Sequence, residues 1–300
     1  MGQTHSPNRV EIGFLCAELR GNGPLTFGYK QRLTTYAEPP PHNTEVRFAA
    51  FPSYVAARFY FSRRGKPMTF TEHPRLLARI AGALYLIITA CALFAYLYVR
   101  DQVIVADNMA QTATNILAHQ QLYRSGFAAA VIVVVCNLPM GLILFELLKV
   151  VNPRLALLAL VFITASATIE AVNLFNYIEP LFTFSLPEYA SAFDALQRQA
   201  LARGSIRMFG YAFSVSLTFF GVFCALMGFL IFRSKFLPAI IGLLMMAAGV
   251  TYWLNSFRLF LALPIPYLQW VTLVAELSLA LWLLVVGLNE AKWRAQAGAR

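Results

Sequence analysis

Charge is scarce in this 300-residue chain, and its scarcity limits what the protein can be. Only 13% of the residues are charged and 59% are hydrophobic, whereas soluble domains carry about a quarter charged residues. The mean hydropathy is +0.61. These values exclude an ordinary soluble domain and predict an integral membrane protein.

Histidine and aspartate are equally sparse, and all of them lie outside the apolar runs. They are His5, His42, His73, His119, Asp101, Asp107 and Asp194. Their positions exclude an intramembrane HExxH zinc site, bis-histidine haem ligation and an aspartyl dyad. A GxxxxGK[ST] phosphate loop is absent as well. The sequence therefore gives no support to an enzyme, and we expect neither a cofactor nor a metal ion.

Cysteine pairs are also lacking. Cys16, Cys91, Cys136 and Cys224 are scattered, without a CxxC pair or the spacing of a secreted disulfide framework. The last three fall in apolar runs, where a free thiol packs as a small hydrophobic group. We interpret them as core-filling residues.

Long apolar runs are missing from residues 1–70, which are rich in Pro, Gly, Asn and Arg and are not expected to fold alone. Met68 opens a stretch, MTFTEHPRLLARIAGALYL, that looks like a natural start, so residues 1–67 are interpreted as a misplaced-start extension or a disordered tail. FPSYVAARFYFSRRGK, which interleaves aromatic and basic residues, suits the alternative of a segment on a membrane surface. Residues 71–290 are the predicted membrane domain and 291–300 a basic cytoplasmic tail.

Six apolar runs fill the membrane domain. They cover residues 80–99, 125–145, 155–178, 208–232 and, on the two sides of Pro264 and Pro266, 236–289. At 1.5 Å per residue, about 20 residues cross a hydrocarbon core of ~30 Å. Backbone polar groups must be paired within such a segment. We therefore predict an all-α membrane protein, a bundle of six transmembrane helices, with a short surface helix over residues 188–204.

Lysine and arginine are distributed unevenly between the two sides of this bundle. Twelve flank it on one side: Arg63, Arg64, Lys66, Arg75, Arg79, Lys149, Arg154, Arg233, Lys235, Lys292, Arg294 and Arg300. Six flank it on the other: Arg100, Arg124, Arg198, Arg203, Arg207 and Arg258. The bias predicts that both termini are cytoplasmic. Anionic lipid, rather than nucleic acid, then accounts for the net charge of +10.

Several strings in the later spans occur in a familiar order. FFGVFCALMGFLIFRSKFLPAIIGLLMMAAGVTYWLNSF followed by AELSLALWLLVVGL, together with RIAGALYLIIT in the first span, closely resembles the bacterial membrane family numbered 4386 among domains of unknown function. The resemblance covers about residues 74–289 and implies a multi-span membrane protein without an established activity. This sequence differs from the family pattern at Phe223, where many relatives carry a histidine within FFGxHC.

Glycines in the fourth and fifth runs recur at a spacing of seven. Gly221 and Gly228 repeat this spacing in one run, and Gly242 and Gly249 in the next. Two helical turns separate the members of each pair, which puts them on one face. Small residues on one face let helix backbones approach closely in membranes, so we expect close helix packing there.

Three ionisable residues fall within the predicted spans, where each charge costs about 2.5 to 3.5 kcal/mol at mid-membrane. Counted at 1.5 Å per residue, Glu170 and Glu276 lie roughly 12 to 14 Å from the outer ends of their helices. Arg258 is close enough to pair with either carboxylate, and Asn173 and Asn255 lie one turn from Glu170 and Arg258. These five residues form the predicted polar cluster in the outer half of the bundle.

The predicted cluster has two interpretations. It is a pocket that binds a small ligand or relays protons, which would make the protein a solute or ion carrier or a sensor. Alternatively, its charges only orient the helices of a non-catalytic structural or partner-binding protein. An enzyme that acts on lipid ranks third, because no histidine or aspartate lies at membrane depth. The residue pattern specifies neither a ligand nor an oligomeric state.

The basic bias can be checked with reporter fusions. Fusions after Lys149, Arg233 or Arg294 should read cytoplasmic, and fusions near His119 or Ser191 should read external. Paired phosphatase and fluorescent-protein fusions measure the side directly. An external C-terminus would overturn either the orientation or the even number of spans.

Overall fold

The structure is a computed structural model that describes residues 73–105 and 107–299. The predictions for the N-terminal extension, including the start at Met68, lie outside these residues. Within them the secondary structure is helical, with no strand. The prediction of an all-α membrane protein is confirmed.

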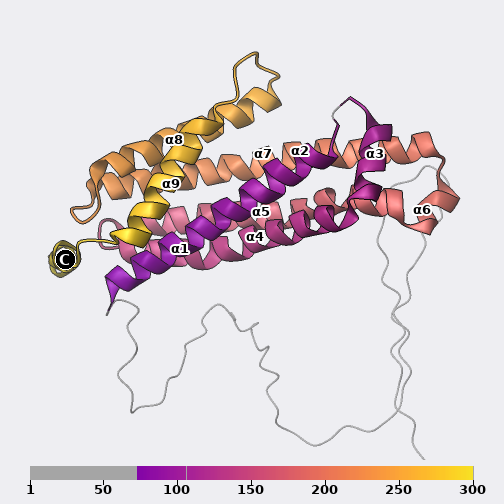
Figure 1. Ribbon diagram of the computed structural model, residues 1–300. Helices are drawn as coiled ribbons and strands as arrows, with labels where there is room; N and C mark the ends of the chain where they lie inside the picture. Colours follow the sequence, from indigo (N-terminus) through magenta and orange to yellow (C-terminus); the bar gives the residue numbers. More distant parts are fainter. Residues whose placement is uncertain (1–72, 106, 300) are drawn as a thin grey trace, which may run out of the picture. The chain divides into compact units, whose positions relative to one another are not determined.

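Eleven helical segments follow one another along the described chain (Figure 1). They are α1 (Pro74–Ala92), the π-helical segment η1 (Leu93–Tyr98), α2 (Val99–Val103), α3 (Met109–Ala118), α4 (Gln120–Leu148), α5 (Pro153–Ser185), α6 (Pro187–Ala192), α7 (Ala195–Arg233), α8 (Ala239–Phe260), α9 (Gln269–Val285) and α10 (Glu290–Gly298). Among the described residues, five stretches are long and apolar enough to cross a membrane, and α9 with α10 forms a sixth that is bent by 96°. With 17 residues, α9 alone is about 25 Å long.

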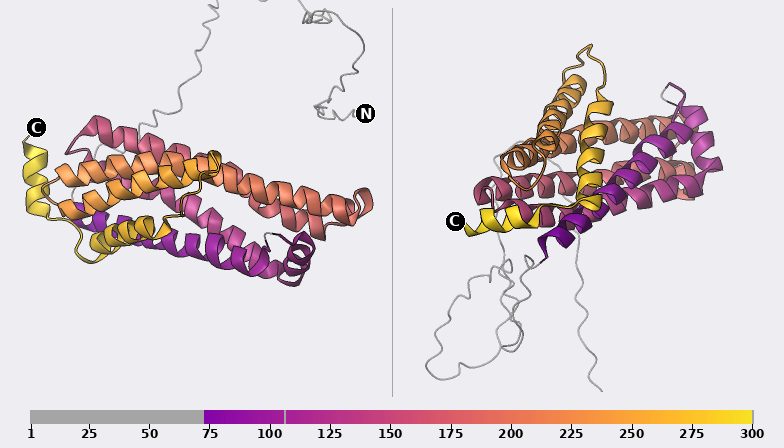
Figure 2. Two further views of the ribbon diagram at one scale, coloured as in Figure 1. Left: turned by 90° about the horizontal axis from the view of Figure 1, so that it is seen from above. Right: turned by 60° about the vertical axis from the view of Figure 1, so that its left-hand side comes forward.

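The long helices are arranged in a closed ring, in which each helix contacts the next. Each of α1, α4, α5, α7, α8 and α9 packs mainly against two of the others, in the order α1, α4, α5, α7, α8, α9 and back to α1. The two views of Figure 2 show α9 lying across α1 and beside α8. The first and last spans therefore close the bundle.

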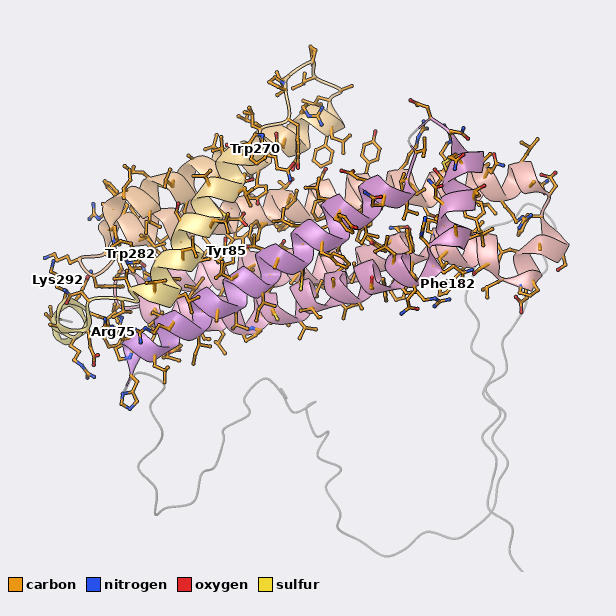
Figure 3. The ribbon with its side chains drawn as sticks, in the orientation of Figure 1. Arg75, Tyr85, Phe182, Trp270, Trp282 and Lys292 are labelled. Carbon is orange, nitrogen blue, oxygen red and sulfur yellow. The ribbon has the colours of Figure 1, made fainter. Side chains whose placement is uncertain are left out.

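One end of the bundle gathers the start of α1, the turns after α4 and α7, and α10. Four hydrogen bonds join the segments at this end: Arg79 Nη2 donates to Val285 O (3.4 Å), Asn289 N to Phe236 O (3.2 Å), Lys235 N to Gln296 Oε1 (3.2 Å) and Trp293 Nε1 to Leu147 O (2.9 Å). Arg75 and Lys292 lie at this end in Figure 3. We call it the basic end, because the described residues of the twelve-residue basic set flank the helices there. The helices α3 and α6 lie at the opposite end (Figure 1).

The expected surface helix over residues 188–204 is not a separate element, and this part of the prediction is wrong. Asp194 and Gln197 form a capping box that starts α7 at Ala195. No proline interrupts the 39 residues that follow, so the amphipathic segment continues directly into the fourth span. Only the six-residue α6 precedes it.

The helices α7 and α8 touch backbone to backbone at the glycines spaced by seven. A Cβ atom on Gly228 would lie 2.6 Å from Gly242 O, and one on Gly221 would lie 2.9 Å from Gly249 O. Real side chains do not approach that closely, so only glycine fits at these crossings. The expected close packing is confirmed.

Alanine substitution tests this crossing against a control in the same helix. Gly228→Ala should destabilise the detergent-solubilised protein by about 1 to 3 kcal/mol, because the helices must separate around the new methyl group. Gly210 has no atom within 4 Å of its potential Cβ, so Gly210→Ala should be neutral or stabilising by up to ~1 kcal/mol. Thermal unfolding measures both, and equal effects of the two changes would contradict the crossing.

Candidate functional site

A cavity of about 290 Å³ lies between α1 with η1, α7, α8 and α9. Its lining consists of Ile88, Thr89, Ala92, Leu93, Tyr96, Leu97, Phe213, Leu217, Tyr252, Tyr267, Gln269, Thr272, Leu273 and Glu276. Along α9 it extends from Gln269 to Glu276, roughly 10 Å at the rise of an α-helix. Most of the wall is apolar, and the polar groups are one carboxylate, one amide and five hydroxyl groups.

Glu276 supplies that carboxylate. The hydroxyl of Tyr252, on α8, donates a hydrogen bond to its Oε1. The Tyr252 ring packs edge-on against Phe220, with centroids 5.4 Å apart, and this contact orients the hydroxyl. Glu276 forms no ion pair within the part of the chain that the structure describes. A carboxylate at membrane depth thus faces a cavity with a neutral partner.

A tyrosine without a hydrogen-bond partner lies near this carboxylate. Tyr85 is 1% exposed, and its hydroxyl has no partner among the described residues. It is close enough to Glu276, Tyr252 and Cys224 to interact with them electrostatically. An unsatisfied buried hydroxyl costs about 1 to 3 kcal/mol. The layer around Glu276 is therefore polar but incompletely satisfied.

The second intramembrane carboxylate, Glu170, is buried and is not among the residues that line the cavity. Tyr96 Oη donates to its Oε1 (2.9 Å), and Asn173 Nδ2 lies 3.4 Å from its Oε2 and 3.2 Å from Phe209 O. The guanidinium of Arg100 lies over the Phe209 ring at 4.5 Å and interacts electrostatically with Glu170. Tyr96, its hydrogen-bond donor, lines the cavity and so connects Glu170 to it.

Tyr96 belongs to the π-helical segment η1, which changes the helical register of the first span. Leu93, Tyr96 and Leu97 face the cavity, whereas Ala95 is completely buried on another side. Tyr177 Oη donates to Ala95 O at 3.2 Å. Single π-helical turns occur frequently at functional sites, and this one positions the tyrosine that separates Glu170 from the cavity.

The connection between α8 and α9 forms the end of the cavity that lies away from the basic end. Asn255 Oδ1 accepts a hydrogen bond from Leu268 N at 3.0 Å, and the guanidinium of Arg258 lies 5.5 Å from the centre of the Tyr267 ring. Burial raises the pKa of Tyr267, and the Arg258 charge offsets part of that rise. These contacts hold Tyr267 at the mouth of the cavity.

The five residues predicted as one cluster therefore occupy three places around a common cavity. Glu276 lines it, Glu170 and Asn173 lie behind Tyr96, and Asn255 and Arg258 hold the loop at its mouth. The expected pairing of Arg258 with a carboxylate is not among the ion pairs of the described residues. The guanidinium instead lies against an aromatic ring.

Residue-by-residue reading of the sequence missed the hydroxyl-bearing residues that join these places. They are Thr89, Tyr96, Tyr252, Tyr267 and Thr272. Spacing offered a signal for some of them. Tyr252 precedes Asn255 by three residues and Thr272 precedes Glu276 by four, and these spacings put both members of a pair on one helix face.

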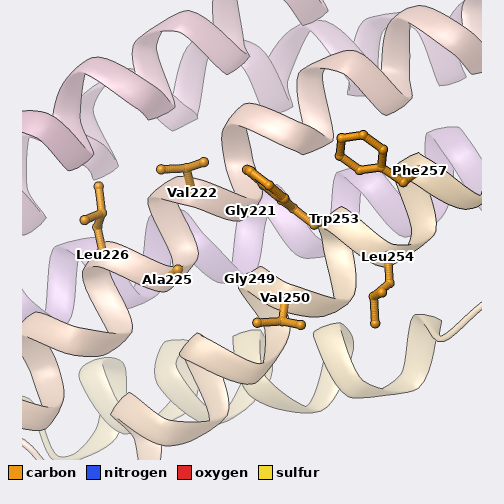
Figure 4. Close-up of a pocket in the computed structure, with 9 residues that line it drawn as sticks. All are labelled: Gly221, Val222, Ala225, Leu226, Gly249, Val250, Trp253, Leu254 and Phe257. Atoms are coloured by element: carbon orange, nitrogen blue, oxygen red, sulfur yellow. The ribbon is translucent and has the colours of Figure 1, made fainter. Parts of the chain in front are cut away.

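A second hollow, of about 500 Å³, lies on the outer surface of α7 and α8 (Figure 4). Its lining consists of Gly221, Val222, Ala225, Leu226, Gly249, Val250, Trp253, Leu254 and Phe257. None of these side chains is ionisable, and the Trp253 indole N–H already donates to Thr218 O at 3.0 Å. The hollow lacks the convergent polar groups of a small-molecule site.

Comparison with known families gives one finding. Residues 80–287 match the family described as "Domain of unknown function (DUF4386)". The chain belongs to this family. The match covers every residue that lines the cavity and confirms the resemblance seen in the sequence. Phe223, where the sequence departs from the expected motif, is 2% exposed and part of the hydrophobic core. Comparison with curated proteins and with solved structures found no match.

A double-mutant cycle tests the partners of Glu276. Tyr252→Phe and Glu276→Gln should couple by about 1 to 3 kcal/mol in the unfolding of the detergent-solubilised protein, because the two side chains share a hydrogen bond to a charged group. Arg258→Met and Glu276→Gln serve as the control and should be additive within ~0.5 kcal/mol. Strong coupling to Arg258 and none to Tyr252 would show that the carboxylate has a different partner.

Proposed function

We propose that this multi-pass membrane protein binds a small solute in the cavity and works as a carrier or sensor in the bacterial inner membrane. The observation that carries the proposal is Glu276, an ionisable residue at membrane depth that lines a cavity. Intramembrane carboxylates commonly mark substrate or ion paths. An apolar wall with a few placed polar groups is typical of a small-molecule site.

The closure of the cavity toward the basic end supports binding from one side. The helices α1 and α9 cross there at Gly82, where a Cβ atom would lie 2.4 Å from Leu284 N and 2.7 Å from Ala280 O. Toward the opposite end the cavity is bordered by Tyr267, which is 49% exposed, and by Gln269. A solute would enter past Tyr267 and stop before Gly82, as expected for one state of a carrier or for a sensor.

A second candidate is a structural role, in which intramembrane charges only orient the helices. The Glu170 group favours it, because both carboxylate oxygens have protein partners and the residue is 5% exposed. Polar groups commonly join helices in this way. The two candidates differ in what they require at Glu276. Solute binding requires water in the cavity beside this side chain, whereas a structural role requires that the space be dry.

Cysteine labelling distinguishes the two candidates with adjacent residues of α9. Leu273 lines the cavity, whereas Val274 is 55% exposed on the outer surface of the bundle. In proteoliposomes, Leu273→Cys should react with a small charged methanethiosulfonate at least tenfold faster than Val274→Cys. Only a hydrated thiol ionises and reacts, and the two positions lie at nearly the same depth.

The native chain, with its own cysteines, supplies the background that is subtracted from both rates. Equally slow reaction at the two positions would mean that the space beside Glu276 is dry, and the structural role would then replace solute binding. If a membrane-impermeant reagent is added only to the outside of the vesicles, reaction at Leu273→Cys would also show from which side the cavity is entered.

A further inference from the structure

We infer that the solute is a small organic cation, an ammonium ion with an apolar substituent. This inference rests on the proposed function, because it assigns a chemical class to the ligand of the same cavity. It draws on the charge, the hydrogen-bonding capacity and the dimensions of the wall.

The wall of the cavity carries an acidic side chain but no basic one. Among the lining residues Glu276 is the acid, and none is lysine, arginine or histidine. Arg258 and Arg100 are not lining residues: their guanidinium groups lie over the rings of Tyr267, at the mouth of the cavity, and of Phe209, outside it. A charge at membrane depth needs a counter-charge or a proton. A cation in the cavity supplies the counter-charge that the described residues do not.

The hydroxyl groups deep in the cavity have already used their protons. Tyr96 donates to Glu170 and Tyr252 to Glu276. Thr89 Oγ1 donates to the carbonyl of Tyr85 (2.9 Å) and Thr272 Oγ1 to that of Gln269 (2.8 Å). Each hydroxyl has one proton but two lone pairs. The deep wall therefore offers acceptors to a ligand and no free hydroxyl donor.

The acceptors in the deep part of the wall select a ligand that donates hydrogen bonds there. An ammonium group has three N–H donors and no acceptor, which matches a carboxylate surrounded by hydroxyl oxygens. An anion or a carbonyl group would meet lone pairs at the same positions. Aromatic rings of Tyr96, Phe213 and Tyr252 in the wall add attraction for a cation held over a ring face.

The dimensions favour an organic ion over a metal ion. The cavity of about 290 Å³ has the volume of roughly ten waters at ~30 Å³ each. No group of three or more His, Cys, Asp or Glu residues that would hold a metal occurs among the described residues. Leucines 93, 97, 217 and 273 line the space around the polar patch, and they provide apolar contacts for a substituent of several carbon atoms.

Three probes of one size and different charge test the inference on the unaltered full chain in detergent. They are 2-phenylethylammonium, 2-phenylethanol and phenylacetate. Titration calorimetry should show that the ammonium ion binds at least tenfold more tightly than the alcohol, and that phenylacetate does not bind. Sodium and potassium chloride at the same ionic strength should not displace the ammonium ion.

Two matched variants locate the charge that is recognised. Glu276→Gln should weaken binding of 2-phenylethylammonium at least tenfold while leaving binding of the alcohol within twofold. Glu146→Gln removes a carboxylate from α4 that is paired with Lys149 and should leave both affinities unchanged. If Glu276→Gln does not fold, the three probes on the unaltered chain still decide the question.

The outcomes separate this inference from the proposed function. If phenylacetate or the alcohol binds as tightly as the ammonium ion, and Ala92→Phe in the wall abolishes that binding, the cavity binds solutes but does not select cations. If no probe binds and Leu273→Cys is not labelled in proteoliposomes, both the inference and the proposed function are overturned. If no probe binds but Leu273→Cys is labelled, the choice of an organic cation is wrong.

Discussion

The free energy needed to hold a carboxylate within an apolar, membrane-spanning helix determines the structure around the cavity. Glu276 lies in α9, within an apolar span, where an ionised side chain is costly. Tyr252 satisfies one oxygen, and the aromatic contact with Phe220 fixes that tyrosine. The remaining surface of Glu276 faces the cavity rather than another helix. The proposed specificity of the pocket follows from this carboxyl group, which has one hydroxyl partner and no ion pair among the described residues.

The two intramembrane carboxylates have opposite surroundings although the sequence places them at similar depth. Glu170 is buried, bonded to Tyr96 and close to Asn173, and within electrostatic range of Arg100. Glu276 has a hydroxyl partner and no ion pair among the described residues. Glu170 thus resembles a structural element, whereas Glu276 retains the capacity to bind a ligand. Tyr96 contacts both environments and connects them.

Hydropathy and charge predicted the membrane bundle, because the physical rule behind them acts on each segment alone. An apolar run of about 20 residues must be helical in lipid, whatever its neighbours are. The spacing of Gly221 and Gly228 likewise predicted a close contact, since it follows from helical periodicity. The separation of residues 188–204 from the fourth span failed because the capping box at Asp194 sets the true start of the helix.

The candidate site was predicted only in part, because its geometry depends on which helices are neighbours. The ionisable residues Glu170, Arg258 and Glu276 stand out in any apolar run. Their partners are tyrosines, which are common at many positions of a membrane helix and carry no distinctive signal. The pairing of Arg258 with Tyr267 depends on the path of the loop before α9, and the π-helical turn that aims Tyr96 has no recognised sequence pattern here.

The shortness of α9 has a consequence for the lipid around it. A helix of 17 residues is about 25 Å long, whereas the hydrocarbon core is ~30 Å thick. Lipid beside a short span adapts by thinning, and the 96° bend into α10 prevents α9 from gaining length at the basic end. We expect the bilayer to be locally thinner along this side of the bundle. Headgroups and water would then descend toward Gln269, so that a charged solute would cross less hydrocarbon to reach Glu276.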